Sequence, residues 1–167
     1  MDLQINLFIE RADTELLLAE KIKILCEEDN TRTMLQIPKQ KTFYSAVISH
    51  AYYSIFYSAK AILLTKNIKT TSPDIHKKTF DEFKKQFVDT GILDVKLLEI
   101  YKKMVIRADK LLEIFKDEKW KRGNFTYHTI PQANKEPAED SINNAKLFFS
   151  NILKVIEFQP NNHGKNK

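Results

Sequence analysis

The chain has 167 residues, which fits one domain with a sizeable core, and its 43% hydrophobic and 29% charged content is ordinary for a globular protein. No run approaches the roughly 20 apolar residues of a membrane span, the N-terminus lacks the basic segment of a signal peptide, and the single cysteine, Cys26, cannot form an internal disulfide. These absences predict a cytoplasmic protein with no membrane association, and the net charge of +5 favours polyanionic partners such as RNA or simply a solvated basic surface.

Apolar residues recur at helical spacing from residue 3 to residue 27, which predicts an amphipathic first helix. Its apolar positions include Leu3, Leu7, Phe8, Ala12, Leu16, Ala19, Ile22 and Leu25. The polar stretch from residue 27 to 33 and the following Pro38 break this pattern, so we expect a connector there.

Residues 43–64 form the most apolar stretch of the chain and contain no proline or glycine. Apolar and aromatic residues lie on nearly every side of a 3.6-residue wheel, which is typical of a helix packed on several faces. We therefore predict that this stretch is the central helix of an all-α bundle. Tyr53 and Phe56, one turn apart on it, are expected to face the core.

Three further helices are expected after the central one. Ser72-Pro73 is a suitable N-cap and first-turn proline for a helix that Gly91 ends. Asp94 can cap a long helix that reaches Trp120 and ends at Gly123, and Pro137 is predicted to start the last helix. The apolar stripe of that last helix is Ala138, Ile142, Ala145, Phe149, Ile152 and Ile156.

Three segments of the chain point to one family. Residues 49–61 read SHAYYSIFYSAKA, residues 76–78 read HKK and residues 87–93 read FVDTGIL. Together they resemble the signature helix, the HK segment and the FV-x-TG-x-L segment of small stand-alone prokaryotic and archaeal proteins of the HEPN superfamily. The resemblance covers about residues 3 to 157. It implies an antiparallel four- to five-helix bundle that often dimerises and, in some members, a metal-independent ribonuclease paired with a minimal nucleotidyltransferase in a toxin–antitoxin module.

Arg122 is followed after five residues by His128. Catalytic HEPN ribonucleases carry an Arg, four to six residues and then a His, so the resemblance assigns the catalytic roles to this pair. Metal-free RNA cleavage needs a base, an acid and a cation near the phosphorus, and a histidine with an arginine can supply them. A structural interpretation stays open, in which Arg122 neutralises the end of a helix and His128 is a loop residue.

Cations and aromatic residues alternate around this pair, in Lys119, Trp120, Lys121, Asn124, Phe125 and Tyr127. Such a mixture stacks bases and contacts phosphates in single-stranded RNA sites, but it also occurs in protein interfaces. We therefore predict that these residues bind RNA or a partner protein.

Two other histidines attract attention. His76 and Lys77 stand near the start of the third predicted helix, where they could bind an anion of RNA or of a partner, or form a solvated basic face. His50 lies among the tyrosines of the central helix and is predicted to be a core or interface histidine, hydrogen-bonded to a tyrosine or to the backbone.

The scattered histidines, the lone cysteine and the lack of a Gly-rich phosphate loop predict that the protein uses no metal and no cofactor. We expect one HEPN-like domain over residues 1–158 and a disordered tail over residues 159–167. Two functions stay open for a protein that we expect to be a homodimer. One is a protein that acts on RNA, and its most specific version is a metal-independent endoribonuclease of toxin–antitoxin type. The other is a non-catalytic module that binds a minimal nucleotidyltransferase or a nucleotide.

Overall fold

The computed structural model describes the backbone of residues 2–120 and 134–158, together with their side chains except those of residues 111–120. This part of the chain forms helices and no strand, so the prediction of an all-α helical bundle is confirmed. The elements in chain order are α1 (Leu3–Glu27), α2 (Asp29–Met34), α3 (Tyr44–Leu64), α4 (Ile75–Phe83), the π-helical turn η1 (Lys84–Val88), α5 (Val95–Trp120) and α6 (Lys135–Phe158).

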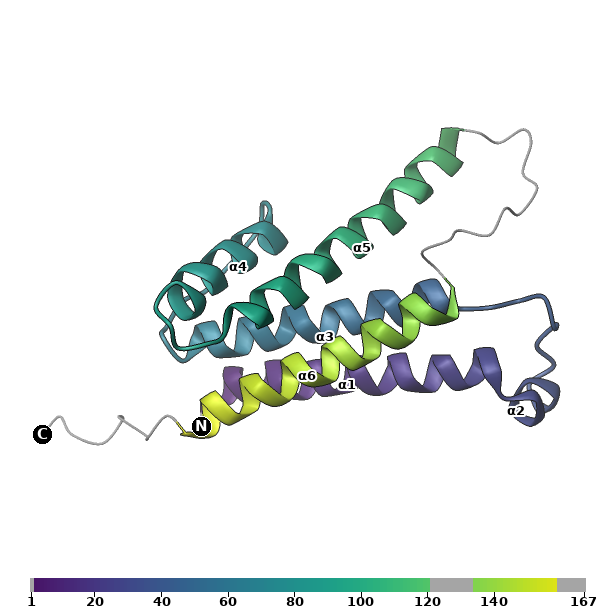
Figure 1. The fold of residues 1–167 in the computed structure, drawn as a ribbon, viewed down its shortest axis with the longest axis horizontal. Coiled ribbons are helices and arrows are strands. Elements are labelled where there is room, and N and C mark those ends of the chain that lie inside the picture. The colour runs from purple at the N-terminus through teal and green to yellow at the C-terminus, as the bar shows by residue number, and fades with distance from the viewer. Residues whose placement is uncertain (1, 121–133, 159–167) are drawn as a thin grey trace, which may run out of the picture.

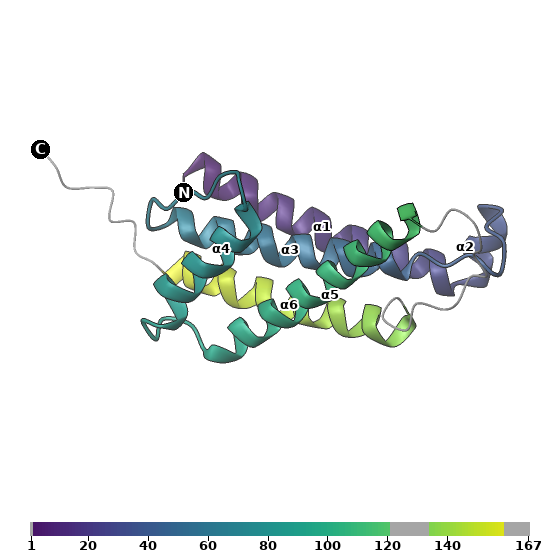
Figure 2. The same ribbon diagram turned by 90° about the horizontal axis from the view of Figure 1, so that it is seen from above.

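Helix α3 lies at the centre of the bundle. It packs against α1 and α6 along its length and against α4 and α5 on another side (Figure 1). Helices α4 and α5 form a second layer over α3 and α6, and α5 diverges from the first layer towards its C-terminal end (Figures 1 and 2). The short helix α2 lies at the end of α1, beyond the start of α3.

The core forms because α3 buries residues on several of its faces, as its sequence predicts. Fully buried bulky side chains from α3 meet aromatic side chains of the second layer and of α6, and small residues between them allow close helix approach. The largest side chains with essentially no exposed surface are Tyr101, Phe83, Phe87, Phe148, Ile48, Ile55, Ile62, Leu63, Met104 and Ile152.

The connector between α1 and α3 is more ordered than the sequence predicts, because it contains α2 and a buried arginine. The Arg32 guanidinium donates hydrogen bonds to five backbone carbonyls, those of Leu25, Cys26, Pro38, Lys39 and Lys41, at 2.7–3.1 Å. A single side chain thereby ties the end of α1 to the segment that enters α3. Buried carbonyls that lack a helical partner are satisfied in this way.

The third predicted helix differs from its prediction at its start. Helix α4 begins at Ile75, and the residue before it is Asp74 with a φ of 59°, so Ser72 is not the cap. Its far end also comes earlier than predicted, because α4 ends at Phe83 and η1 at Val88, and Gly91 follows in the turn with a φ of 72°, in the left-handed region that glycine tolerates. Asp94 caps α5 as predicted, because its carboxylate accepts a 2.7 Å hydrogen bond from the backbone N–H of Lys96.

Helix α6 begins at Lys135, two residues before the predicted start at Pro137, which lies in its first turn. Its buried stripe contains Phe148, whereas the predicted Phe149 is only partly buried. Phe148 takes the buried position because its ring packs against those of Phe83 and Tyr101, at centroid distances of 5.3 and 5.6 Å.

The outer side of α1 also differs from expectation. Leu3 and Leu7, predicted to belong to its apolar face, are 73% and 54% exposed, and Ile5 is buried in their place. Among the helices of residues 2–120 and 134–158, none is both long enough and apolar enough to cross a membrane.

Candidate functional site

A cavity of about 500 Å³ lies between α3, the start of α4 and the middle of α5. This volume is within the range of small-molecule and cofactor sites, about 300–1,000 Å³. His76 and Lys77, the two predicted site residues whose side chains the structure describes, both line it. The remaining lining residues are Ser49, Tyr52, Tyr53, Asp74, Phe80, Val105, Ala108 and Asp109.

His76 is held in the cavity wall by side chains of α3. Its Nδ1 lies 2.8 Å from the phenol oxygen of Tyr52, and its ring centroid lies 4.3 Å from that of Phe56. The imidazole therefore has a fixed plane and one occupied nitrogen. Its other nitrogen, Nε2, has no hydrogen-bond partner within the described part of the chain and is available to a ligand.

The surroundings of His76 favour its neutral form. Loss of water around the ring lowers the pKa of His76, the nearby Asp109 carboxylate opposes this change, and the Lys60 ammonium adds to it. Burial likewise raises the pKa of Tyr52 far above its ordinary value. At neutral pH the cavity thus presents a neutral imidazole beside a protonated phenol, with the charges of Lys77 and Asp109 at its wall.

Tyr53, which also lines this cavity, is 38% exposed, so the prediction that it faces the core is wrong. Its ring packs against those of Tyr57 and Tyr52 at centroid distances of 6.3 and 5.6 Å. Phe56, by contrast, is 4% exposed and belongs to the core as predicted.

His50 lies outside this cavity and has a different partner from the one predicted. Its Nδ1 is 2.5 Å from the carboxylate of Glu15 on α1, and the second oxygen of that carboxylate accepts from Arg11 at 2.7 Å. Glu15 is buried, with 3% of its surface exposed. His50 therefore pairs with a carboxylate rather than with a tyrosine or the backbone, because α1 brings an acidic side chain opposite it.

The predicted catalytic pair, Arg122 and His128, lies outside the described residues, as do Lys121, Asn124, Phe125 and Tyr127. Only the backbone of Lys119 and Trp120, at the end of α5, is described. Asp109 in the cavity wall precedes Trp120 by eleven residues, about 16 Å along a helix that rises 1.5 Å per residue. The roles assigned to these residues stay predictions.

Sequence reasoning missed Tyr52 and Asp109 as parts of the site. Tyr52 is embedded in the apolar helix and carries no signal of its own. Asp109 follows the buried stripe of Tyr101, Met104 and the partly buried Val105 and Ala108, so a helical wheel would have placed it at the edge of that stripe. Its approach to α4 could not be read from the chain.

The arrangement can hydrogen-bond a polar ligand through the imidazole, the phenol and the ammonium group, and it can stack a planar group on exposed tyrosine. The neutral imidazole can also accept a proton. Within the described residues no group of three His, Cys, Asp or Glu side chains could hold a metal ion.

The chain has relatives among curated proteins, whereas no family model and no solved structure matches it. The protein named "Putative toxin MJ0605", from Methanocaldococcus jannaschii, is 31% identical over 140 residues, which are 83% of this chain and 90% of the relative. "Putative toxin MJ0142" of the same organism is 38% identical over 81 residues, 46% of this chain and 53% of the relative. A "UPF0332 protein" of Thermotoga maritima is 29% identical over 119 residues, 71% of this chain and 76% of the relative. Because the first match spans most of both chains, this protein belongs to the family of the M. jannaschii protein named "Putative toxin MJ0605".

Proposed function

We propose that this protein is a HEPN-type toxin that acts on RNA as a metal-independent endoribonuclease. The observation that carries the proposal is the match over 90% of the relative named "Putative toxin MJ0605". The helical bundle fits the HEPN resemblance of residues 49–61, 76–78 and 87–93. The net charge of +5 suits a polyanionic substrate.

In this proposal Arg122 and His128 carry the chemistry. His128 takes the proton of a ribose 2′-hydroxyl, and the freed oxygen attacks the adjacent phosphorus. The bond from phosphorus to the 5′-oxygen then breaks, and that oxygen leaves with a proton from water or from an imidazolium of a second copy. Arg122 stabilises the charge of the pentacoordinate phosphorus, and the products are a 2′,3′-cyclic phosphate and a 5′-hydroxyl.

The cavity between α3, α4 and α5 would hold a nucleotide near the cleaved bond. Lys77 can neutralise a phosphate, His76 can donate or accept one hydrogen bond, and Tyr53 can stack on a base. Lys119, Trp120, Lys121, Asn124, Phe125 and Tyr127 would extend this contact along the strand. The cavity and the catalytic pair are thus assigned different tasks, positioning and chemistry.

A toxin needs a partner that restrains it, so the names of the relatives favour an antitoxin. From the HEPN resemblance we propose that this antitoxin is a minimal nucleotidyltransferase, that the toxin is a homodimer, and that both act in the cytoplasm.

The test is an RNA cleavage assay in EDTA with purified protein and a single-stranded oligonucleotide. We expect products with 2′,3′-cyclic phosphate ends and loss of cleavage in Arg122→Ala and His128→Ala. The matched control is His163→Ala, which removes a histidine of the expected tail, residues 159–167, and should cleave fully. His76→Gln and Lys77→Met should raise KM more than they lower kcat. Cleavage that survives His128→Ala would exclude the assigned mechanism. A protein that never cleaves but binds RNA, a nucleotide or a nucleotidyltransferase would be the non-catalytic module.

A further inference from the structure

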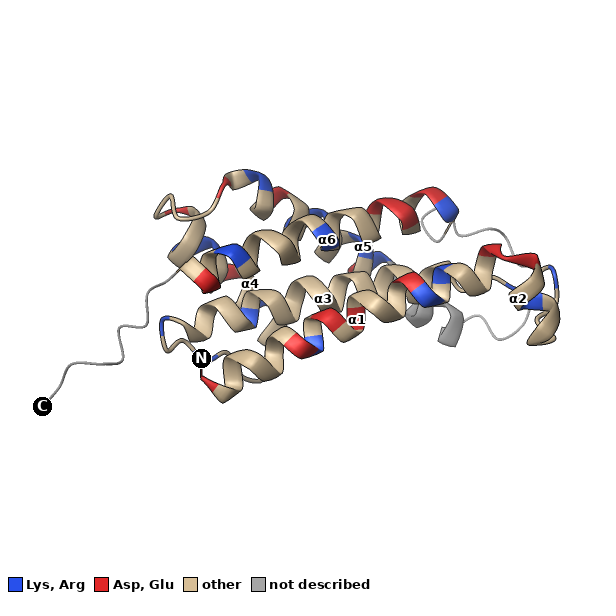
Figure 3. Cartoon of the chain, turned by 90° about the horizontal axis from the view of Figure 1, so that it is seen from below, with Lys and Arg blue, Asp and Glu red and all other residues tan. Residues whose placement is uncertain are grey.

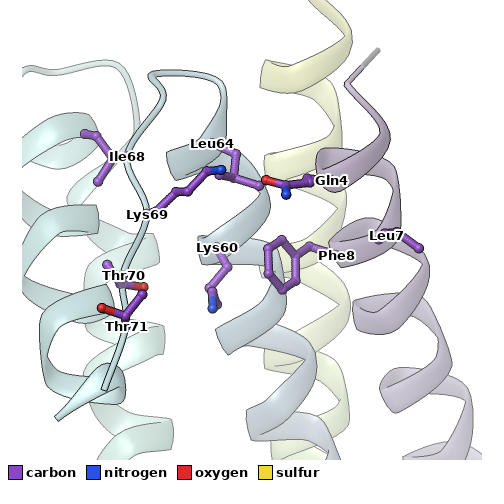
Figure 4. Close-up of a pocket in the computed structure, with 9 residues that line it drawn as sticks. All are labelled: Gln4, Leu7, Phe8, Lys60, Leu64, Ile68, Lys69, Thr70 and Thr71. Carbon is purple, nitrogen blue, oxygen red and sulfur yellow. The ribbon is translucent and has the colours of Figure 1, made fainter. Parts of the chain in front are cut away.

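A second pocket, of about 360 Å³, lies at the other end of α3 from its start, between α1 and the segment that follows α3 (Figure 4). Its wall is mainly apolar, with Leu7 and Phe8 from α1, Leu64 from α3 and Ile68 from the following segment. The other lining residues are Gln4, Lys60, Lys69, Thr70 and Thr71. Among the residues that the structure describes, two lysines and no carboxylate therefore line this pocket.

Lys60 has an unusual environment for a charged side chain. It is the one Lys, Arg, Asp or Glu among the 21 residues of α3 (Figure 3). Its Nζ lies 4.7 Å from the ring centroid of Phe8 and 5.7 Å from that of Phe56. Partial burial lowers the pKa of Lys60, and within the described residues the ammonium group meets no hydrogen-bond acceptor and no carboxylate.

Lys66 shows how the chain satisfies a comparable lysine. Its Nζ lies 4.6 Å from the ring centroid of Phe87, and it also donates a 2.7 Å hydrogen bond to the carbonyl of Gln86. Lys60 has the same kind of contact with aromatic rings, but within the described residues it lacks a carbonyl that accepts a hydrogen bond from its ammonium group. Because a partly desolvated ammonium gains most from a charged acceptor, an anion would complete its surroundings.

The neighbouring polar groups do not supply that acceptor. The hydroxyl of Thr70 is paired with that of Thr79 at 2.7 Å, and the carbonyl of Thr71 accepts from Lys78 at 3.4 Å. Lys69, on the segment across from Lys60, adds a second positive charge (Figure 4). Charge and shape together therefore specify a ligand with one anionic end and an apolar body.

We propose that this pocket binds a small organic anion, with its carboxylate or phosphate on Nζ of Lys60 and its apolar body against Leu7, Phe8, Leu64 and Ile68. This site goes beyond the proposed action on RNA and does not depend on it. Phe56, in the core, lies against both Lys60 of this pocket and His76 of the larger cavity.

The test measures binding of octanoate and of phenyl phosphate to the intact chain by titration calorimetry and by NMR of the lysine side chains. Octanamide, which has the shape of octanoate without its charge, and inorganic phosphate, which has charge without an apolar body, are the matched probes. We expect at least one organic anion to bind about tenfold more tightly than both matched probes, as a charge-assisted hydrogen bond in an apolar site should allow. Which of the two binds identifies the anionic group.

Lys60→Met keeps the length and the apolar stem of the side chain and should weaken that binding about tenfold or more, while Lys66→Met should leave it unchanged. The bound anion should also raise the pKa of Lys60 in the unaltered protein, a measurement that needs no variant. Equal binding of octanoate and octanamide, or equal binding by the wild type and Lys60→Met, would overturn the proposal. Displacement of the anion by single-stranded RNA in a Lys60-dependent way would also overturn it, because the lysine would then belong to an RNA surface.

Discussion

The phenol oxygen of Tyr52 on α3 lies 2.8 Å from Nδ1 of His76 on α4. This hydrogen bond joins the central helix to the second layer at the wall of the larger cavity, and the His76 ring also rests on Phe56. The histidine available to a ligand is therefore part of the packing between two helices, so changes at the cavity should be measurable in stability as well as in binding.

The Tyr52 hydroxyl should stabilise the fold. Tyr52→Phe removes its hydrogen bond to His76 and should lower the free energy of unfolding by about 0.5–1.5 kcal/mol, the usual net value of such a bond. Tyr101→Phe is the matched control, since the buried Tyr101 hydroxyl has no hydrogen-bond partner within the described residues. Its removal should leave the free energy of unfolding unchanged or raise it. Urea titrations of both variants check the pair, and equal losses would contradict the assigned hydrogen bond.

Stability should depend on pH through His76. Because the folded state holds its pKa below the ordinary 6.5, the unfolded chain binds the proton more readily. The contribution of neutral His76 is therefore fully present above about pH 6.5 and is lost as the pH falls from there through the folded pKa. We expect the wild type to lose more free energy of unfolding between pH 7.5 and 5.5 than His76→Gln does. Parallel pH profiles for the two proteins would refute this expectation.

Truncation of two neighbouring aromatic residues of α3, Phe56 and Tyr53, should lower the free energy of unfolding by very different amounts. Phe56→Ala should cost about 3–5 kcal/mol as a large-to-small change in the core. Tyr53→Ala, one turn away and 38% exposed, should cost far less. Chemical unfolding of both variants tests the assignment of their faces. A loss below about 1 kcal/mol for Phe56→Ala would place its ring outside the core.

Glu15 should matter more for stability than a carboxylate in a solvated ion pair. It is buried and bridges Arg11 and His50, so Glu15→Gln should lower the free energy of unfolding by about 1–3 kcal/mol. Glu20 pairs with Lys146 across α1 and α6, but the Lys146 side chain is 53% exposed and that of Glu20 is 35% exposed. Glu20→Gln should therefore change stability by less than about 1 kcal/mol. Urea titrations of the two variants compare their free energies of unfolding, and similar losses of stability would argue against a special role for the buried bridge.

The fold was predictable because hydrophobic periodicity and helix-capping residues indicate most of the helices. Periodicity placed α1 and α3 to within a residue, and Asp94 acts as the helix cap that its chemistry predicts. His76 and Lys77, singled out because they stand near a predicted helix start, line the larger cavity, and their role as site residues stays a prediction. These features depend on residues close in sequence.

What escaped prediction depends on residues that are far apart in sequence. Nothing around His50 indicates that Glu15, thirty-five positions earlier, is its partner, and nothing around Tyr53 indicates that 38% of its surface stays exposed. The same holds for Tyr52 and Asp109, which meet His76 only once α3, α4 and α5 are assembled. The helical wheel gives the direction of a side chain but not the element opposite it.

The π-helical turn η1 has a consequence for how sequences of this family should be aligned. Its hydrogen bond from the Asp89 N–H to the Lys84 carbonyl spans five residues, one more than in an α-helix. The extra residue is accommodated within the turn, and Phe83 before it and Phe87 within it are both fully buried. Removing one residue from 84–88 would restore an α-helical turn and leave the residues after it on their present faces, whereas an α-helical turn of unchanged length would rotate them by about 100°. Relatives with a regular helix here should therefore show a one-residue gap, and an ungapped alignment would pair buried positions with exposed ones.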